Sequence, residues 1–156
     1  MKNNLNPRQQ LGKYGELTVA ARFLDEGREV YFPAVDDHGI DMMVITQDHI
    51  HGDGTQPEHY PFQEIQVKTV ATPLQTPFTF SLSKDRARPN YWFVFYVKEI
   101  ETFWIINSMD IITPGAFSQN ISGKNTGKYN VSLTTTSGNI SQKNAKYIVK
   151  DFSAIP

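Results

Sequence analysis

The chain has 156 residues, 39% of them hydrophobic, which fits one compact domain over residues 1–156 and leaves too little for two. It has no cysteine, no apolar run near the roughly 20 residues of a membrane helix and no basic-then-apolar leader, so we expect a cytoplasmic protein, although the lack of cysteine alone also suits an exported one. A formal net charge of -1 argues against binding nucleic acid by bulk electrostatics alone.

The charge is divided unevenly along the chain. Residues 1–110, which we take as the core with the candidate site, carry ten basic and fifteen acidic groups. Residues 111–156, a lysine-rich C-terminal extension of the same domain, carry five lysines and one acid. Two interpretations stay open: these lysines face a polyanion, or they keep a surface soluble.

The first predicted element is a helix over residues 8–26, since apolar and small residues recur there at helical spacing and Gly27 suits its C-terminal cap. Strands are predicted at 29–35 and 40–46, on either side of a turn at 36–39. A long connection over 47–61 precedes a third strand at 62–70.

The predicted elements after residue 70 are short. A strand at 78–82 runs into a brief basic helix over 81–88, which Pro89 ends. Two aromatic-rich strands at 91–97 and 102–107 form a hairpin and complete the sheet. The remainder holds a strand at 129–133 and a final helix over 141–152.

The strand at 62–70 carries the clearest functional signal. Because strand side chains alternate between faces, Ile65 and Val67 point to one side while Glu64, Gln66 and Lys68 line the other. A polar face on a strand that otherwise looks buried costs stability unless its groups have partners. We therefore interpret this face as a site.

These residues suit the attack of water on a phosphodiester, in which a divalent ion is held by one or two carboxylates. Asp41 is the obvious ligand, and the Gln66 amide and the Val67 carbonyl supply further oxygens. Lys68 is placed to orient the water or to stabilise charge on the phosphate. Glu16, on the flank of the first helix, would close the site.

Three motifs, Gly12-x-x-Gly15-Glu16, Gly39-Ile40-Asp41 and Gln66-Val67-Lys68, resemble the PD-(D/E)xK nuclease superfamily in its Gln-x-Lys form, over roughly the first 70 residues. Small bacterial members of unknown function are the most similar. The resemblance implies an α/β, restriction-endonuclease-like fold, with a mixed central sheet flanked by helices and the first helix before the catalytic strands. It also implies a Mg²⁺ or Mn²⁺ cofactor, DNA as the partner and, for double-strand cutting, a homodimer.

By that likeness Glu16, Asp41, Gln66 and Lys68 take the family's catalytic roles. The first three surround the metal, together with the Val67 carbonyl. Two features depart from the family pattern. Gln66 replaces the usual glutamate, which removes one negative charge, and Glu64 either restores part of it or pairs with Lys68. The long helix that commonly follows the lysine strand is not expected here, because prolines interrupt residues 73–89.

Other groups are candidate binding residues. Arg86 and Arg88 either grip phosphates or lie on a plain surface, and His38 either contacts substrate or is an exposed turn residue. A zinc site is conceivable in the 47–61 loop, where His49, His51 and His59 lie, but their spacing matches no standard finger. The aromatic residues of 91–104 are better explained as core than as a base-stacking surface.

Three functions follow from the sequence. The first is a metal-dependent DNA endonuclease. The second is a catalytically weak or inactive module on the same fold, which binds nucleic acid or protein in a defence or repair system. The third is an interaction domain in which Asp41 only caps a turn and Lys68 and Glu64 form a surface pair.

Overall fold

The chain opens with a long helix in the computed structural model, which describes residues 6–34, 39–45, 62–121, 123–124 and 126–156. Helix α1 (Pro7–Asp25) begins at an Asn6 cap, where the Asn6 and Gln9 side chains each accept the other residue's backbone N–H at 3.0 Å. Gly27 follows the helix with a φ of 75°, as expected for a C-terminal cap. The helix predicted over 8–26 is confirmed.

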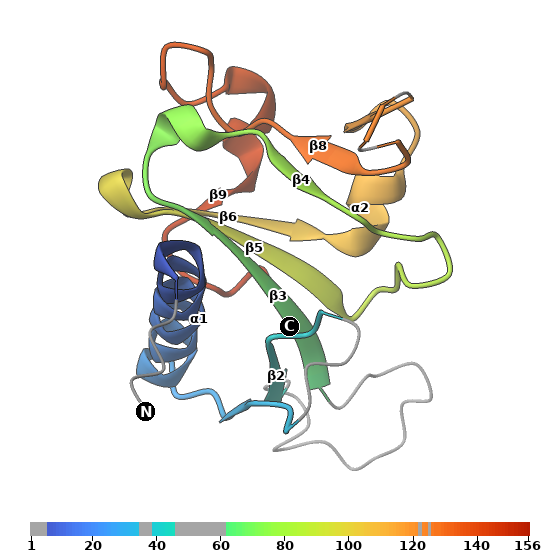
Figure 1. Cartoon of the computed structure of the whole chain (residues 1–156). Helices are drawn as coiled ribbons and strands as arrows, with labels where there is room; N and C mark the ends of the chain where they lie inside the picture. Colours follow the sequence, from blue (N-terminus) through green and yellow to red (C-terminus); the bar gives the residue numbers. More distant parts are fainter. Residues whose placement is uncertain (1–5, 35–38, 46–61, 122, 125) are drawn as a thin grey trace.

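The main sheet has six strands among the described residues, in the order β1-β2-β3-β5-β6-β9 (Figure 1). They are β1 (Val30–Tyr31), β2 (Met42–Ile45), β3 (Phe62–Val70), β5 (Tyr91–Val97), β6 (Thr102–Asn107) and β9 (Ile148–Val149). Strands β3 and β5 pair in parallel and the other neighbours are antiparallel, so the sheet is mixed, as predicted. The predicted bounds of β3, β5 and β6 agree with the structure.

The two faces of this sheet are covered differently (Figure 1). Helix α1 packs on one face, where Val19 and Phe23 join Ile65 and Val67 in a buried cluster. A small sheet of β4 (Phe78–Phe80), β8 (Tyr129–Val131) and β7 (Ser118–Gln119), in that order, covers the other. The fold class is therefore mixed α/β, but in the described residues the second face is covered by a sheet instead of helices.

The aromatic side chains of β5 fill the core between the two sheets. The Phe95 ring lies 4.9 Å from the Phe78 ring, and the Phe93 ring lies 4.7 Å from the Phe80 ring, measured between centroids. Both β5 phenylalanines are fully buried. The core interpretation of these aromatic residues is confirmed.

The remaining elements are short: η2 (Pro73–Gln75), η3 (Lys98–Ile100), α2 (Ser108–Ile112) and η4 (Gln142–Tyr147). The helix predicted over 141–152 is wrong, because η4 ends at the β-branched pair Ile148–Val149, which joins the edge of β6. The helix predicted over 81–88 is wrong as well. That segment is a turn, in which the N–H groups of Arg86 and Ala87 both donate to the Ser83 carbonyl. No long helix follows β3, as expected; η2 and β4 follow it instead.

A glycine sets how closely α1 approaches β3. A Cβ on Gly15 would lie 1.8 Å from Oγ1 of Thr69, so this helix turn rests directly on the strand. Gly12, by contrast, has no described atom beyond its own helix backbone within 4 Å of the same position.

None of the helices in the described part of the chain combines the length and apolar character of a membrane span.

Candidate active site at the edge of strand β3

Strand β3 extends beyond the end of its neighbour β2, so this part of its edge is not paired with β2. Asp41 lies at that edge. The β2–β3 ladder ends at the pair Met42 and Ile65, and Asp41 comes just before β2, not inside a strand as predicted. Its N–H donates to the Ile65 carbonyl at 2.9 Å. Its carboxylate accepts the N–H of Val67 at 2.6 Å. Asp41 is therefore held in place by hydrogen bonds through both its backbone N–H and its carboxylate.

The carbonyl of Val67 belongs to the same edge. In a strand, the N–H and C=O of one residue project toward the same neighbour. Since the Val67 N–H reaches Asp41, the Val67 carbonyl also projects on the side where β2 has ended. The structure thus brings together one carboxylate and one carbonyl that the sequence analysis had assigned to a metal.

Glu16 approaches Asp41 from α1. The two acids line one cavity of about 200 Å³, together with Lys13, Phe32, Pro33 and Ile40. Nζ of Lys13 lies 2.7 Å from Oε2 of Glu16, in an ion pair that the sequence analysis did not identify. Lys13 is largely exposed, so the pair is a weak constraint on Glu16.

The Gln66 side chain is fixed from two sides. The Tyr91 hydroxyl donates to its amide oxygen at 3.0 Å, and a Cβ on Gly39 would come within 2.5 Å of its amide nitrogen. Gly39 has a φ of 71°, which glycine adopts without strain. The glycine before Ile40 and Asp41 thus makes room for Gln66.

Charged side chains of both signs surround the Tyr91 hydroxyl. Burial raises the pKa of Tyr91 to about 12; Arg86 and Arg88 lower it, while Asp41 and Glu64 raise it. Tyr91 therefore stays a neutral donor at physiological pH. The sequence analysis had placed it only in the core, because nothing in its spacing indicated the register that carries it to the site.

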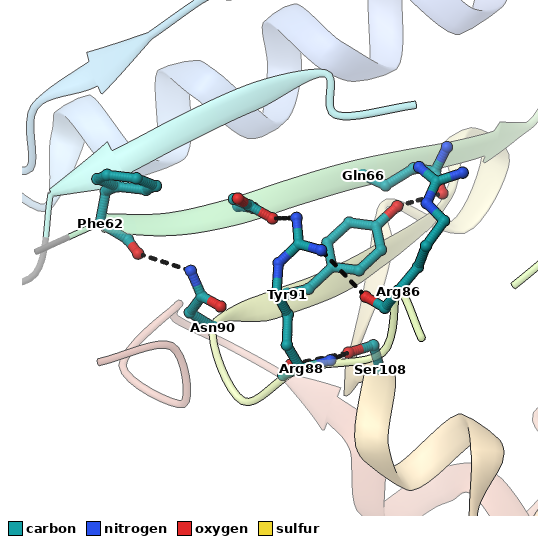
Figure 2. A network of polar contacts seen from close by, with 8 residues as sticks. Phe62, Gln66, Arg86, Arg88, Asn90, Tyr91 and Ser108 are labelled. Carbon is teal, nitrogen blue, oxygen red and sulfur yellow. Dashed lines mark hydrogen bonds and ion pairs between the residues drawn. The ribbon is translucent and has the colours of Figure 1, made fainter. Parts of the chain in front are cut away.

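Glu64 pairs with Arg88, whose guanidinium donates to its carboxylate (Figure 2). This partner differs from the one that the sequence analysis considered for Glu64. The parallel register explains the difference, because Glu64 lies opposite Tyr91 at the start of β5, where the basic segment enters the sheet. Ser108 Oγ anchors that segment, accepting the Arg88 N–H at 3.0 Å and donating to its carbonyl at 2.9 Å.

Lys68 and Arg86 belong to different elements. Lys68 lies opposite Phe95 in the β3–β5 register, so it shares a face with Gln66, as the alternation predicted. The Arg86 side chain extends from the turn over residues 81–88, here called the basic turn, toward Gln66 and the Tyr91 hydroxyl (Figure 2). His38 lies outside the described residues, as does the 47–61 loop with its three histidines.

The donor atoms at this edge fit a hard divalent ion. Asp41 and Glu16 offer carboxylates, and Gln66 and Val67 offer neutral oxygens, a set that suits Mg²⁺ with its retained waters. Where side chains are described, no group of three or more His, Cys, Asp or Glu residues is placed to hold a metal ion. A metal here would therefore depend on the amide and the carbonyl in addition to the acids.

The backbone resembles that of a bacterial homing endonuclease of known structure. The match, to I-Ssp6803I, has a TM-score of 0.54 at 16% sequence identity and covers 92% of this chain and 88% of that one. At this identity the likeness concerns the fold alone. No protein-family model matches the chain, and no curated protein matches it.

Proposed function

We propose that the chain hydrolyses phosphodiester bonds of DNA with Mg²⁺ or Mn²⁺, as an endonuclease. The observation that carries the proposal is the contact between Asp41 and the Val67 N–H at the open edge of β3, with Gln66 fixed beside it. The homing-endonuclease-like fold over nearly the whole chain supports a nuclease and makes DNA the first substrate to test.

In this proposal each residue has one task. Asp41, Glu16, Gln66 and the Val67 carbonyl hold the ion, which, when bound, polarises the phosphate and lowers the pKa of water. Lys68 orients the attacking water or stabilises charge that develops on the phosphate. Lys13 engages Glu16 until the ion takes its place. Cutting both strands with one site per chain would require a homodimer.

Calorimetric titration with Mn²⁺ tests the proposal without a known substrate. We expect the wild-type protein to bind Mn²⁺ and Asp41→Ala to lose at least tenfold in affinity, since it removes one of only two carboxylates. Asp110→Ala, an exposed acid on α2, is the matched control and should bind as the wild type does. Equal affinity in Asp41→Ala and wild type would rule out this metal site.

A second candidate function is a catalytically weak or inactive module that binds nucleic acid or a protein partner. Two observations favour it: Gln66 is neutral, and Glu16 already has a cationic partner in Lys13. This module would bind a DNA duplex but leave it uncut in Mn²⁺. Binding and cleavage of the same duplex, measured side by side, separate the two functions.

Gly39→Ala tests whether the amide of Gln66 contributes to metal binding. The new Cβ would displace that amide, and we expect about tenfold weaker Mn²⁺ binding, typical of a disturbed metal-site support. Gly27→Ala is the matched control, because Gly27 also has a positive φ, but beyond its chain neighbours no described atom lies within 4 Å of the new Cβ. Both variants should lose about 1–2 kcal/mol of stability from backbone strain. Unchanged Mn²⁺ affinity in Gly39→Ala would remove Gln66 from the ligand set.

A further inference from the structure

We infer that Arg86, and not Arg88, contacts a backbone phosphate of the nucleic acid at this site, and that the neutral side chain of Gln66 keeps Arg86 available for it. The inference rests on the proposed function, since it takes DNA as the ligand. It assigns different roles to Arg86 and Arg88, for which the sequence analysis gave the same interpretations. It also gives a reason for the glutamine that departs from the family pattern.

The charge of Arg88 is already compensated within the fold. Its guanidinium pairs with Glu64 and lies over the Tyr91 ring, 5.2 Å from the centroid. The Glu64 side chain is 13% exposed and the Arg88 side chain 33%, so the pair is partly shielded from solvent. If Arg88 moved to a phosphate, Glu64 would remain as a partly buried charge without its ion-pair partner, and this would cost stability. Arg88 therefore serves to hold the basic turn.

Arg86 is held by its backbone and not by its side chain. Its N–H donates to the Ser83 carbonyl at 3.1 Å, and its own carbonyl accepts from Nη1 of Arg88 at 3.3 Å. Within the described residues its guanidinium has no hydrogen bond or ion pair. It is nonetheless only partly exposed, and it extends toward Gln66 and Tyr91 (Figure 2). A partly buried guanidinium that points into the site suits bidentate contact with a phosphate.

The side chain at position 66 decides whether Arg86 keeps its charge available. The amide of Gln66 is neutral, and its oxygen accepts the Tyr91 hydroxyl. A glutamate at 66 would place a carboxylate within the reach of Arg86, and the two would form an ion pair. Such a pair would neutralise the phosphate-binding group. The substitution Gln66→Glu would therefore weaken DNA binding even though it adds a charge for the metal.

The experiment measures binding of a fluorescent mixed-sequence DNA duplex, with Ca²⁺ in place of Mg²⁺, over a series of KCl concentrations. Each phosphate contact contributes about 0.9 to the slope of log K against log salt. We expect Arg86→Gln to lower the slope by about 0.9 and Arg86→Lys to retain it. The double variant Glu64→Gln with Arg88→Gln removes the ion pair without stranding a charge, and its slope should equal that of the wild type.

The glutamine is tested in a double-mutant cycle. Gln66→Glu alone should lower the slope about as much as Arg86→Gln does, and should lower it no further in the Arg86→Gln background. Thermal denaturation of every variant shows that the slopes come from folded protein.

The outcomes separate this inference from the proposed function. If the wild type binds the duplex and Arg86→Gln has the same slope, Arg86 makes no phosphate contact and the inference fails alone. A slope lowered equally by loss of the Glu64–Arg88 pair would assign the contact to Arg88 instead. An equal effect of Gln66→Glu in both backgrounds would disprove the coupling. If the wild type does not bind DNA at any salt concentration, the proposed function fails as well.

Discussion

Replacing Lys68 with alanine is expected to lower the cleavage rate by about 10²–10³-fold, the usual cost of losing one group that stabilises transition-state charge. Lys68 shares a face of β3 with Gln66, two residues along the strand from it. An alanine there keeps the strand and its pairing but removes the ammonium. The rate should be measured in single turnovers on a DNA that the wild type cuts, so that product release does not mask the chemistry.

The control for Lys68→Ala is Lys84→Ala, which removes the same charge from an exposed position on the basic turn. Its rate should stay within a few-fold of the wild type, since its charge is far more screened by solvent. Mn²⁺ binding should persist in Lys68→Ala, because the ammonium is not a ligand. Full cleavage activity in Lys68→Ala would exclude Lys68 as a catalytic residue.

Gly15→Ala is expected to destabilise the fold by about 1–3 kcal/mol, the range for overpacking a close contact. The new Cβ would sit 1.8 Å from Oγ1 and 2.8 Å from Cβ of Thr69, so α1 must move away from β3. Because Glu16 is the next residue, this movement also shifts an acid of the candidate site. Urea denaturation gives the stability change, and Mn²⁺ titration gives the effect on the site.

The same helix contains its own control in Gly12→Ala. Among the described residues, no atom beyond the helix's own backbone lies within 4 Å of a Cβ at Gly12, so alanine should stabilise the helix by up to about 1 kcal/mol through its higher helix propensity. The two glycines are three residues apart in the same helix, and they should give opposite signs. Equal stability changes in the two variants would show that α1 does not rest on Thr69.

Sequence patterning predicted the long strands of this fold correctly. Strand β3 carries a clear alternation, and β5 and β6 are aromatic-rich and bounded by turn residues, so local signals sufficed. The small second sheet could not be predicted in the same way. Its strands β4 and β8 pair Phe78 with Val131, and no local pattern shows that two segments so far apart in sequence are neighbours.

In the candidate site, too, some residues could be selected from the sequence, whereas their contacts could not. Order and spacing were enough to select Asp41, Gln66 and Val67, which the structure brings together at one edge. The contacts of Tyr91 with Gln66 and of Arg88 with Glu64 depend on the parallel register of β3 and β5. That register is a property of the folded sheet, so neither partner could be identified from the sequence.

Phe152 and Ile155 belong to the buried cluster between helix α1 and the main sheet. The Phe152 ring packs 4.7 Å from Phe23 of helix α1 and 5.4 Å from Phe103 of strand β6, measured between centroids. The buried Arg28 side chain also donates to the Ile155 carbonyl at 2.6 Å. Contacts of such high sequence separation slow folding, because the loop must close before they form. On the ribosome, α1 therefore emerges long before Phe152, and the part of Phe23 that packs on Phe152 stays uncovered until that residue has been synthesised.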